Sequence, residues 1–503
     1  MPVDPPWDIC DLCGDGLVTS TKPQQLANSF RYLMPVLVAN LIQLVTLPVF
    51  TRFVPTEDFG AWALAGSYAV VAGGIAMLGV QSTYERNFFQ YTGDSRPTLL
   101  YSVVAFSSAA LSVAVAVTWW WRASISLWLT GNVRYQEVVV MAFAGTALMS
   151  VKDYFMTYLR SDEQATSFAV YSIADRALAA VLQMIAVVML GLGVRGIVIG
   201  QVIATAALLI MIVAKFLRCA PWTFAWGPVL DSLKLGLPTL PRMLLVSVGN
   251  NADKYLVSRL SSLGAAGVYA VGQRVATIGF NYLVAINNVY KPKVYQMMFH
   301  GGANAPVDIG RYLTPFAYIA SLFAFLVAVF SEEALLMLAP GSYAAAITVV
   351  TLLALHYGLQ FFGTMPQIMF AGKTYWIPIL TASAMIFNLG LGVLGIRWFG
   401  MVGAAWGALA AGAINAAATF VIGQQCYRVV WQRERMAAIF AGLVASALVM
   451  IVLRGLGTPY FLLLAAKLAM TGLYLWVGYR LGVVTSGNLK LVRDFIAAGG
   501  RTR

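Results

Sequence analysis

Charged residues stand inside stretches of the chain that are otherwise apolar. Three adjacent acid–base pairs and two arginines with no acid close in sequence have this placement: Lys152–Asp153, Asp175–Arg176, Asp253–Lys254, Arg242 and Arg274. A charge at the centre of a membrane helix costs about 2.5–3.5 kcal/mol on the insertion scale, so such residues usually face a protein interior or a wet cavity. Bases there can bind an anionic group, and acids there can take up and release a proton.

Helical periodicity places these residues on polar stripes. Gln273, Thr277 and Asn281 recur every four positions and so share one helical face, which Arg274 borders. Such a stripe would be costly against lipid but would line a wet groove if it faced inward. The predicted substrate-binding residues are the five bases and the two amides on these stripes: Arg242, Arg274, Lys152, Arg176, Lys254, Gln273 and Asn281. Arginine suits a diphosphate, because its planar guanidinium donates two hydrogen bonds to oxygen atoms.

The three acids have two possible roles. Asp153, Asp175 and Asp253 are candidates for coupling transport to protons, because a carboxylate at membrane depth can change its protonation state. Each could instead neutralise a base on another helix, since adjacent positions on one helix point about 100° apart and pair poorly. Both roles stay open. Five bases against three acids give the set a net positive charge, which favours an anionic substrate.

The elements that carry these residues must be membrane helices. Hydrophobic residues make up 60% of the 503 residues and charged residues only 11%, against about 25% in soluble domains. Apolar stretches of spanning length cover residues 26–52, 59–80, 98–121, 134–159, 167–190, 196–217, 234–258, 263–289, 311–331, 343–370, 374–396, 400–425, 437–454 and 459–480. The sequence therefore predicts an all-α polytopic membrane protein with about 14 transmembrane helices.

The chain also repeats itself at a constant offset. The segment that starts at Thr51 is similar to the one that starts at Ser258, so that Arg52 falls on Arg259. The same offset aligns GVRGIVIG with GMVGAAWG near the end of each half. Six predicted helices per half make the two repeats parallel and leave a C-terminal helix pair. Two similar halves in an apolar chain are typical of a transporter with its site between them.

Prolines recur in the first predicted helix of each half. They are Pro35, Pro48, Pro238 and Pro241. Proline removes a backbone donor and kinks a helix. Kinks at matching places in two repeats often mark a binding site or a hinge, although a tolerated kink is also common in membranes.

Lysine and arginine predict the orientation, because cytoplasmic loops carry more of them. The segments on the side of the termini hold most of the bases, among them Arg160, Lys293 and Arg433. Both termini are therefore predicted to be cytoplasmic. The net charge of +13 follows from loops that face anionic lipid, so no nucleic-acid partner is predicted. The predicted domains are a cytoplasmic tail (1–25), an N-lobe (26–218), a C-lobe (219–427), a helix pair (428–482) and a second cytoplasmic tail (483–503).

Signatures of catalysis and of cofactor binding are absent from the sequence. It contains no phosphate-binding glycine loop with Lys-Ser or Lys-Thr, no Gly-x-Ser-x-Gly and no His-Glu-x-x-His. Cys10 and Cys13 form a single CDLC without a second pair of ligands, so no metal site is predicted. The predicted outer loops are too short to hold the acceptor and donor of a sugar polymerase or ligase. We therefore predict a translocator that is not an enzyme and uses no cofactor.

Two segments carry a family resemblance. NLIQLVTLPVFTRFVPTEDFGAWALAGSYAVV resembles the first two helices of bacterial polysaccharide biosynthesis membrane proteins, and LKLGLPTLPRMLLVSVGNNADKYLVSRLSSLGAAGVYAVGQRVA resembles their seventh and eighth. These proteins are the oligosaccharide or O-antigen (Wzx-type) flippases of the multidrug/oligosaccharidyl-lipid/polysaccharide exporter superfamily. The resemblance covers most of residues 26–425. It implies fourteen helices in two lobes with a cationic central cavity, lined by the charged residues named above.

The resemblance also implies a function. The protein would move a polyprenyl-diphosphate-linked oligosaccharide from the inner to the outer leaflet of the bacterial inner membrane by alternating access. The product would serve O-antigen, exopolysaccharide or capsule assembly, with the lipid bilayer and the pathway's polymerase and glycosyltransferases as partners. A multidrug or cation antiporter of the same superfamily is the first alternative, although it would need an acidic cavity. A lipid II flippase, with the same diphosphate chemistry, is the second, and a membrane polymerase or ligase is the third.

Overall fold

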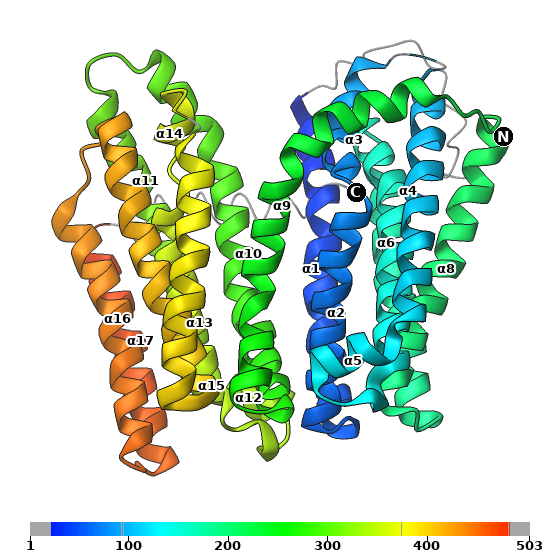
Figure 1. Ribbon diagram of the computed structural model, residues 1–503. Coiled ribbons are helices and arrows are strands. Elements are labelled where there is room, and N and C mark those ends of the chain that lie inside the picture. The colour runs from blue at the N-terminus through cyan, green and yellow to red at the C-terminus, as the bar shows by residue number, and fades with distance from the viewer. Residues whose placement is uncertain (1–21, 92, 94, 374, 481, 483–503) are drawn as a thin grey trace, which may run out of the picture. The chain divides into compact units, whose positions relative to one another are not determined.

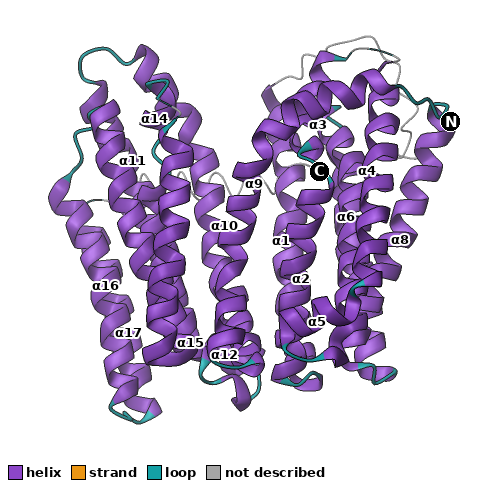
Figure 2. Cartoon of the chain, viewed as in Figure 1, coloured by secondary structure: helices purple, strands orange, loops and turns teal. Residues whose placement is uncertain are grey.

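The computed structural model describes residues 22–91, 93, 95–373, 375–480 and 482. Within these ranges the chain forms helices and no strands, as the colouring by secondary structure in Figure 2 shows. Ten of the described helical segments are long and apolar enough to cross a membrane. The predicted all-helical membrane fold is therefore confirmed. Cys10, Cys13 and both predicted tails lie outside the described residues, apart from residues 22–25.

The chain divides into two compact units, and the boundary falls within one helix. The first unit contains α1 (Lys22–Phe53), α2 (Thr56–Ala76), α3 (Val80–Gln90), α4 (Ser95–Trp120), α5 (Arg122–Thr130), α6 (Gln136–Ser161), α7 (Ala165–Met184) and α8 (Gly193–Cys219). Helix α9 (Trp226–Leu260) belongs to the first unit as far as Asn251 and to the second from Ala252. The domain boundaries predicted from the sequence stay a prediction.

The second unit continues from the end of α9. It contains α10 (Leu263–His300), α11 (Ala305–Val329), α12 (Ser331–Leu338), α13 (Ala346–Leu359), α14 (Pro366–Phe370), α15 (Trp376–Cys426), α16 (Arg433–Gly455) and α17 (Tyr460–Arg480). Helix α15 holds two of the predicted apolar ranges. Its backbone turns at Gly400, where φ is 59°, a left-handed value that glycine adopts without strain. The count of fourteen spans and the two-fold repeat remain predictions.

The first unit is built around α6. Figure 1 draws this helix in cyan, and it packs against α2, α4 and α8. Aromatic side chains fill the space between these helices. The rings of Phe155 and Tyr158 on α6 meet Phe216 of α8 at 5.1 and 5.3 Å, and Tyr158 also meets Phe88 of α3 at 5.2 Å. These near-perpendicular contacts fix the short helix α3 on the core of the unit.

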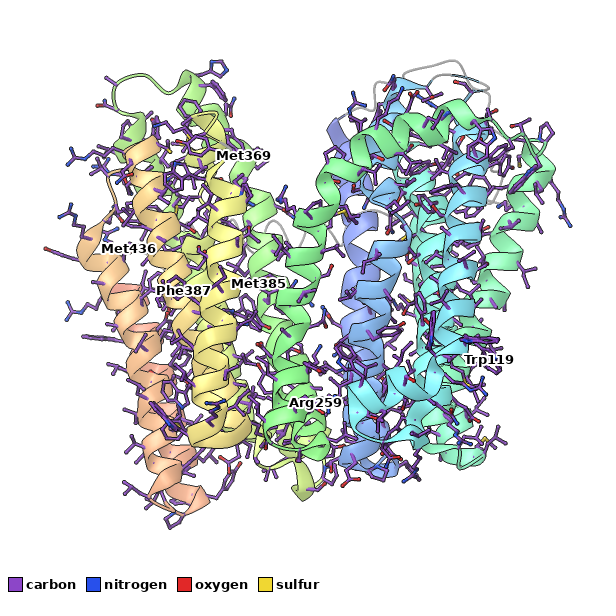
Figure 3. All side chains as sticks on the ribbon, viewed as in Figure 1. Trp119, Arg259, Met369, Met385, Phe387 and Met436 are labelled. Atoms are coloured by element: carbon purple, nitrogen blue, oxygen red, sulfur yellow. The ribbon has the colours of Figure 1, made fainter. Side chains whose placement is uncertain are left out.

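An exposed tryptophan cluster marks one end of α4. Trp119, labelled in Figure 3, is followed by Trp120 and Trp121, and all three rings are exposed. The guanidinium of Arg122 lies 4.5 Å from the ring centroid of Trp119. Tryptophan and arginine together are typical of the boundary between membrane and water. The cluster therefore fits the end of a membrane span.

A buried charged cluster in the second unit joins α12 to the C-terminal helix pair. The Nζ atom of Lys467 on α17 lies 2.8 Å from Glu332 and 2.6 Å from Glu333, and its side chain is fully buried. Arg454 of α16 donates to the hydroxyls of Ser331 and Thr351 at 3.1 Å. Lys467, a charge inside the predicted span 459–480, is therefore neutralised by two acids of its own unit.

Candidate functional site

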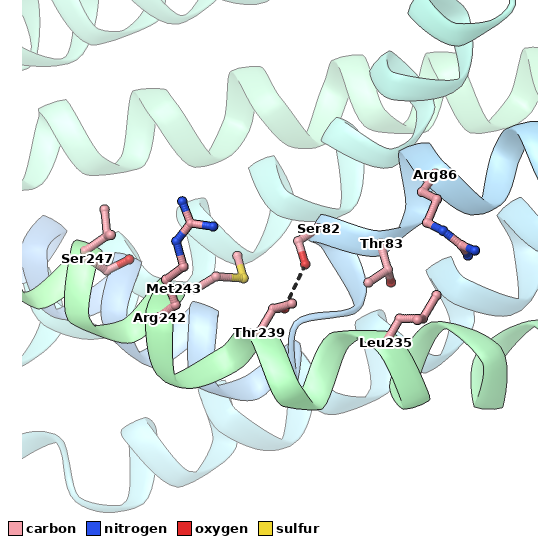
Figure 4. Close-up of a pocket in the computed structure, with 9 residues that line it drawn as sticks. Ser82, Thr83, Arg86, Leu235, Thr239, Arg242, Met243 and Ser247 are labelled. Atoms are coloured by element: carbon pink, nitrogen blue, oxygen red, sulfur yellow. Dashed lines mark hydrogen bonds between the residues drawn. The ribbon is translucent and has the colours of Figure 1, made fainter. Parts of the chain in front are cut away.

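A cavity of about 570 Å³ lies in the first unit, between α3 and the first half of α9. Figure 4 shows it from close by. Apolar side chains from α9 form part of its wall: Leu235, Met243 and Val246. Four hydroxyl groups add hydrogen-bonding capacity: Ser82, Thr83, Thr239 and Ser247. Two arginines complete the lining, Arg86 from α3 and Arg242 from α9.

The turn before α3 brings the two walls of the cavity together. Leu78 and Gly79 have positive φ angles of 51° and 76°, and the helix is interrupted there between α2 and α3. Gly79 then meets Gly236 of α9 backbone to backbone. A Cβ atom at Gly236 would lie 2.8 Å from the carbonyl carbon of Gly79, which is too close for any side chain. Glycine at both positions therefore lets α3 start directly on α9.

Hydrogen bonds then hold α3 along α9. The buried amide of Asn87 donates to the hydroxyl of Ser232 at 2.9 Å, and Thr83 donates to the carbonyl oxygen of Ser232 at 3.1 Å. Beyond the end of α3, the hydroxyl of Tyr91 donates to Asp231 at 2.9 Å. The hydroxyls of Ser82 and Thr239 lie 3.4 Å apart at the cavity itself, as the dashed line in Figure 4 marks. These contacts give the cavity fixed walls.

The two predicted prolines of α9 border this cavity without ending the helix. Pro238 and Pro241 lie inside α9, and Arg242 follows directly. Each proline lacks an N–H group, so a carbonyl oxygen one turn earlier loses its usual helical partner. Unpaired backbone next to a proline is frequent where a membrane helix lines a binding site. The cavity lies beside these prolines, and whether they mark a binding site, a hinge or a tolerated kink stays a prediction.

The cavity has an excess of positive charge. None of the described residues that line it is acidic, and neither Arg86 nor Arg242 forms an ion pair with a residue that the structure describes. Glu85, the acid nearest to Arg86 in sequence, is 3.1 Å from Arg160. Neither guanidinium group is in an ion pair with a described acid, and hydroxyl groups lie beside both. Such a site can bind an anion, because each planar guanidinium can donate two hydrogen bonds to phosphate oxygens.

Lys152 and Asp175 form an ion pair inside the first unit. Their side chains are 6% and 3% exposed, so the pair is shielded from solvent. Asp153 and Arg176, their neighbours in sequence, are exposed. The ion pair thus joins α6 to α7 and takes one member from each of two predicted pairs. Within each predicted pair, adjacent residues point in different directions, as helix geometry requires.

The remaining predicted residues lie in the second unit. Asp253 is buried near the end of α9, where its carboxylate accepts hydrogen bonds from Asn388 at 2.8 Å and Tyr269 at 3.2 Å. Its four predicted companions follow on α9 and α10, and all are half-buried: Lys254, Gln273, Arg274 and Asn281. Of the seven predicted substrate-binding residues, Arg242 is the one that lines the described cavity. A common cavity for the whole set stays a prediction.

Sequence reasoning did not select two of the candidate residues, Arg86 and Asn388. Arg86 lies between two predicted spans, in a segment without a long apolar run, so its context does not indicate membrane depth. The internal repeat does align it with Lys293, and a base at the same place in both halves is a usable signal. Asn388 is a single amide within the apolar range 374–396, and a search for polar residues in such ranges would find it.

No group of histidine, cysteine or acidic residues in the described part of the chain has the arrangement of a metal site. The predicted absence of a metal stays a prediction, because Cys10 and Cys13 lie outside that part.

Comparisons with known proteins show the family of the chain and its fold. A model of the family described as "Polysaccharide biosynthesis protein" matches residues 25–298, more than half of the chain. No curated protein matches the sequence. Among solved structures, the chain is similar to the lipid II flippase MurJ in an inward closed conformation. The TM-score is 0.69 and the identity 13%, over 89% of this chain and 98% of that protein.

Multidrug transporters share the same fold. An inward-facing multidrug resistance MATE family transporter of the MOP superfamily gives a TM-score of 0.59 and 16% identity, over 82% of this chain and 98% of the transporter. A MATE transporter from Vibrio cholerae gives 0.57 and 17%, over 81% and 97%. At such identities the likeness shows a fold. That fold is the one of flippases and exporters, and the choice of substrate depends on the site.

Proposed function

The chain belongs to the polysaccharide biosynthesis protein family, and from this premise we propose that it is a flippase for a polyprenyl-diphosphate-linked oligosaccharide. The substrate would move from the inner to the outer leaflet of a bacterial inner membrane by alternating access, with both termini of the protein in the cytoplasm. The product would feed the assembly of O-antigen, exopolysaccharide or capsule. A polymerase and glycosyltransferases of the same pathway would be its partners, and it would carry out no chemical reaction itself.

The observation that carries this proposal is the charge of the cavity. Arg86 and Arg242 line one space together with four hydroxyl groups, and none of its described lining residues is an acid. A diphosphate needs donors and positive charge, and a guanidinium supplies both. Hydroxyl groups replace the water that a sugar loses on leaving the solvent, since an unpaired buried hydroxyl costs several kcal/mol. The apolar side chains of Met243 and Val246 suit the start of the lipid tail.

The same charge argues against a cation exporter. An exporter of organic cations needs acids to balance its substrate, and none of the described residues of this cavity is acidic. The fold does not separate the two functions, because MATE transporters and MurJ both resemble the chain. The cation antiporter is therefore the weaker candidate.

A lipid II flippase is the second candidate. The likeness to MurJ, at a TM-score of 0.69, is compatible with it. A diphosphate is common to both substrates, so the two arginines would serve either one. The head group separates the candidates, since lipid II carries a peptide and the oligosaccharide does not.

The acids differ in their suitability for coupling. Asp175 is paired with Lys152, which supports a structural role. Asp253 accepts hydrogen bonds from two neutral groups, the amide of Asn388 and the hydroxyl of Tyr269. A carboxylate held by neutral groups can lose and regain its proton with less rearrangement than one in an ion pair. Asp253 is therefore the proposed coupling residue, ahead of Asp175 and the exposed Asp153.

Transport by arginine variants tests the proposed function. The purified chain is placed in liposomes, and flipping of a fluorescent polyprenyl-diphosphate oligosaccharide is compared with that of lipid II. Arg242→Ala and Arg86→Ala should each lower the rate about tenfold or more, the effect of losing a hydrogen bond to a charged group. Arg242→Lys should recover part of the rate, because lysine keeps the charge but lacks the planar fork.

Membrane insertion of each variant is the control, measured as the amount of folded protein in the liposomes. Full transport by both alanine variants would remove the anion site. Faster transport of lipid II than of the oligosaccharide would favour the lipid II flippase over the oligosaccharide flippase. Transport of an organic cation without either lipid would support the antiporter.

A further inference from the structure

Asn87 links the guanidinium of Arg86 to the backbone of α9. Its Oδ1 atom accepts a hydrogen bond from Nη1 of Arg86 at 3.1 Å, and its Nδ2 atom donates to Oγ of Ser232 at 2.9 Å. Ser232 in turn donates to the carbonyl oxygen of Pro228 at 2.8 Å. The result is a directional chain of three hydrogen bonds, from a cavity arginine through two side chains to the first turn of α9.

Burial makes this series of hydrogen bonds rigid. Asn87 and Ser232 are both fully buried, whereas Arg86 is exposed. A buried amide without partners would cost about 1–3 kcal/mol, so Asn87 is held in the orientation that satisfies both of its ends. Ser232 donates to Pro228, so its oxygen must accept from Asn87. This fixes the carbonyl end of the Asn87 amide toward Arg86.

We propose that Asn87 and Ser232 are positioning residues that orient Arg86 toward a diphosphate in the cavity. The inference rests on the proposed function and adds to it a second layer of side chains behind the anion site. A freely rotating arginine loses side-chain entropy when it binds. Asn87 removes part of that loss before the ligand arrives, and it does so as a neutral residue, which leaves the positive charge of Arg86 available to the anion.

The neutrality of Asn87 is what distinguishes this role from simple packing. An aspartate at the same position would keep nearly the same shape and would place a carboxylate beside the guanidinium. Arg86 would then be neutralised, as Lys152 is by Asp175 elsewhere in the same unit. Asparagine orients the arginine without competing with the ligand for it. A role in packing alone would weaken binding equally with and without Arg86.

A double-mutant cycle tests the proposal on the purified full-length chain. Binding of inorganic pyrophosphate is measured by calorimetry for the wild type, Asn87→Ala, Arg86→Ala and the double variant. Asn87→Ala should weaken binding about tenfold, the size of one hydrogen bond to a charged group. The same substitution should have no effect in the Arg86→Ala background, because Asn87 acts through Arg86. Asn87→Asp should weaken binding at least as much as Arg86→Ala.

Tyr91→Phe is the matched control. It removes another hydrogen bond between the α3 segment and α9, that of Tyr91 with Asp231, at a position that does not line the cavity. It should lower thermal stability and leave pyrophosphate affinity unchanged. Asn87→Asp serves as a second variant of nearly native shape in case Asn87→Ala does not fold.

Two results would overturn the positioning role while leaving the proposed function intact. One is wild-type affinity in both Asn87 variants. The second is an equal weakening by Asn87→Ala with and without Arg86, which would mean that Asn87 only stabilises the fold. Wild-type affinity in Arg86→Ala and Arg242→Ala, or no binding by the wild type, would instead overturn the anion site and the positioning role with it.

Discussion

At the scale of single residues, the sequence shows which side chains are out of place in lipid but not which of them meet. Lys152, Asp153, Asp175 and Arg176 form two adjacent pairs in the sequence. In the folded unit one member of each pair, Lys152 and Asp175, forms a buried ion pair between α6 and α7. That choice depends on the rotation of two helices about their axes, and a sequence determines this rotation only through packing.

The buried pair leads to a stability prediction. Asp175→Asn should destabilise the first unit by about 3–5 kcal/mol, because it leaves the ammonium of Lys152 buried without its partner. Removing both charges, as in Lys152→Met with Asp175→Asn, should restore much of the loss. Thermal unfolding of the single and double variants in detergent measures the effect. Additive losses in the double variant would show that the two residues do not act as a pair.

At the scale of elements, all fourteen apolar ranges predicted from the sequence fall wholly or largely on described helix. Apolar runs near 20 residues leave little choice of structure in lipid, since every backbone group needs an internal partner. The short helices were not predicted. Helices α3, α5, α12 and α14 have 11, 9, 8 and 5 residues. Segments of this length depend on tertiary contacts, and α3 carries one of the two cavity arginines.

Helix α12 supplies a prediction about pH. Burial raises the pKa of the Glu333 carboxyl. The hydrogen bonds that the carboxyl accepts from Lys467, the backbone and Tyr460, together with the charge of Lys467, more than offset this effect, so that the pKa lies below its ordinary value. A lowered pKa in the folded state contributes stability that is present above the ordinary value and is lost as the pH falls through the lowered one. The second unit should therefore become less stable below about pH 4.

Variants of this cluster isolate the effect. Glu333→Gln should be less stable than the wild type at neutral pH and should approach it as the pH falls. Lys467→Met should be the most destabilised of the set, by about 3–5 kcal/mol, since it removes the basic partner of Glu333 and leaves Glu332 with Arg454 alone. Melting temperatures between about pH 7 and pH 3 measure both trends, because the range must extend below the ordinary carboxyl pKa. A constant difference between Glu333→Gln and the wild type would exclude a pH-dependent bond.

At the scale of the whole molecule, composition and the family resemblance were enough to predict a helical membrane protein related to flippases. The family and the fold bear this out. Substrate class could not follow from the fold, because lipid flippases and multidrug exporters share it. The sequence also did not predict how the charged residues are divided between the two folded units. Of the ten predicted substrate-binding and coupling residues, five lie in the first unit and five in the second.

Orientation in the membrane is the remaining property that acts on the whole chain, and it decides whether the cavity can receive its substrate. The excess of Lys and Arg predicts that Arg433 faces the cytoplasm and that Arg195 and Arg397 face the opposite side. All three residues are exposed. In a variant without native cysteines, Arg195→Cys and Arg397→Cys should react with an impermeant maleimide added to intact cells. Arg433→Cys should react only after the membrane is opened. Labelling of the Arg433→Cys variant alone in intact cells would reverse the predicted orientation and the proposed direction of transport. Labelling of all three variants in intact cells would contradict the predicted span order, which places Arg433 on the side opposite Arg195 and Arg397.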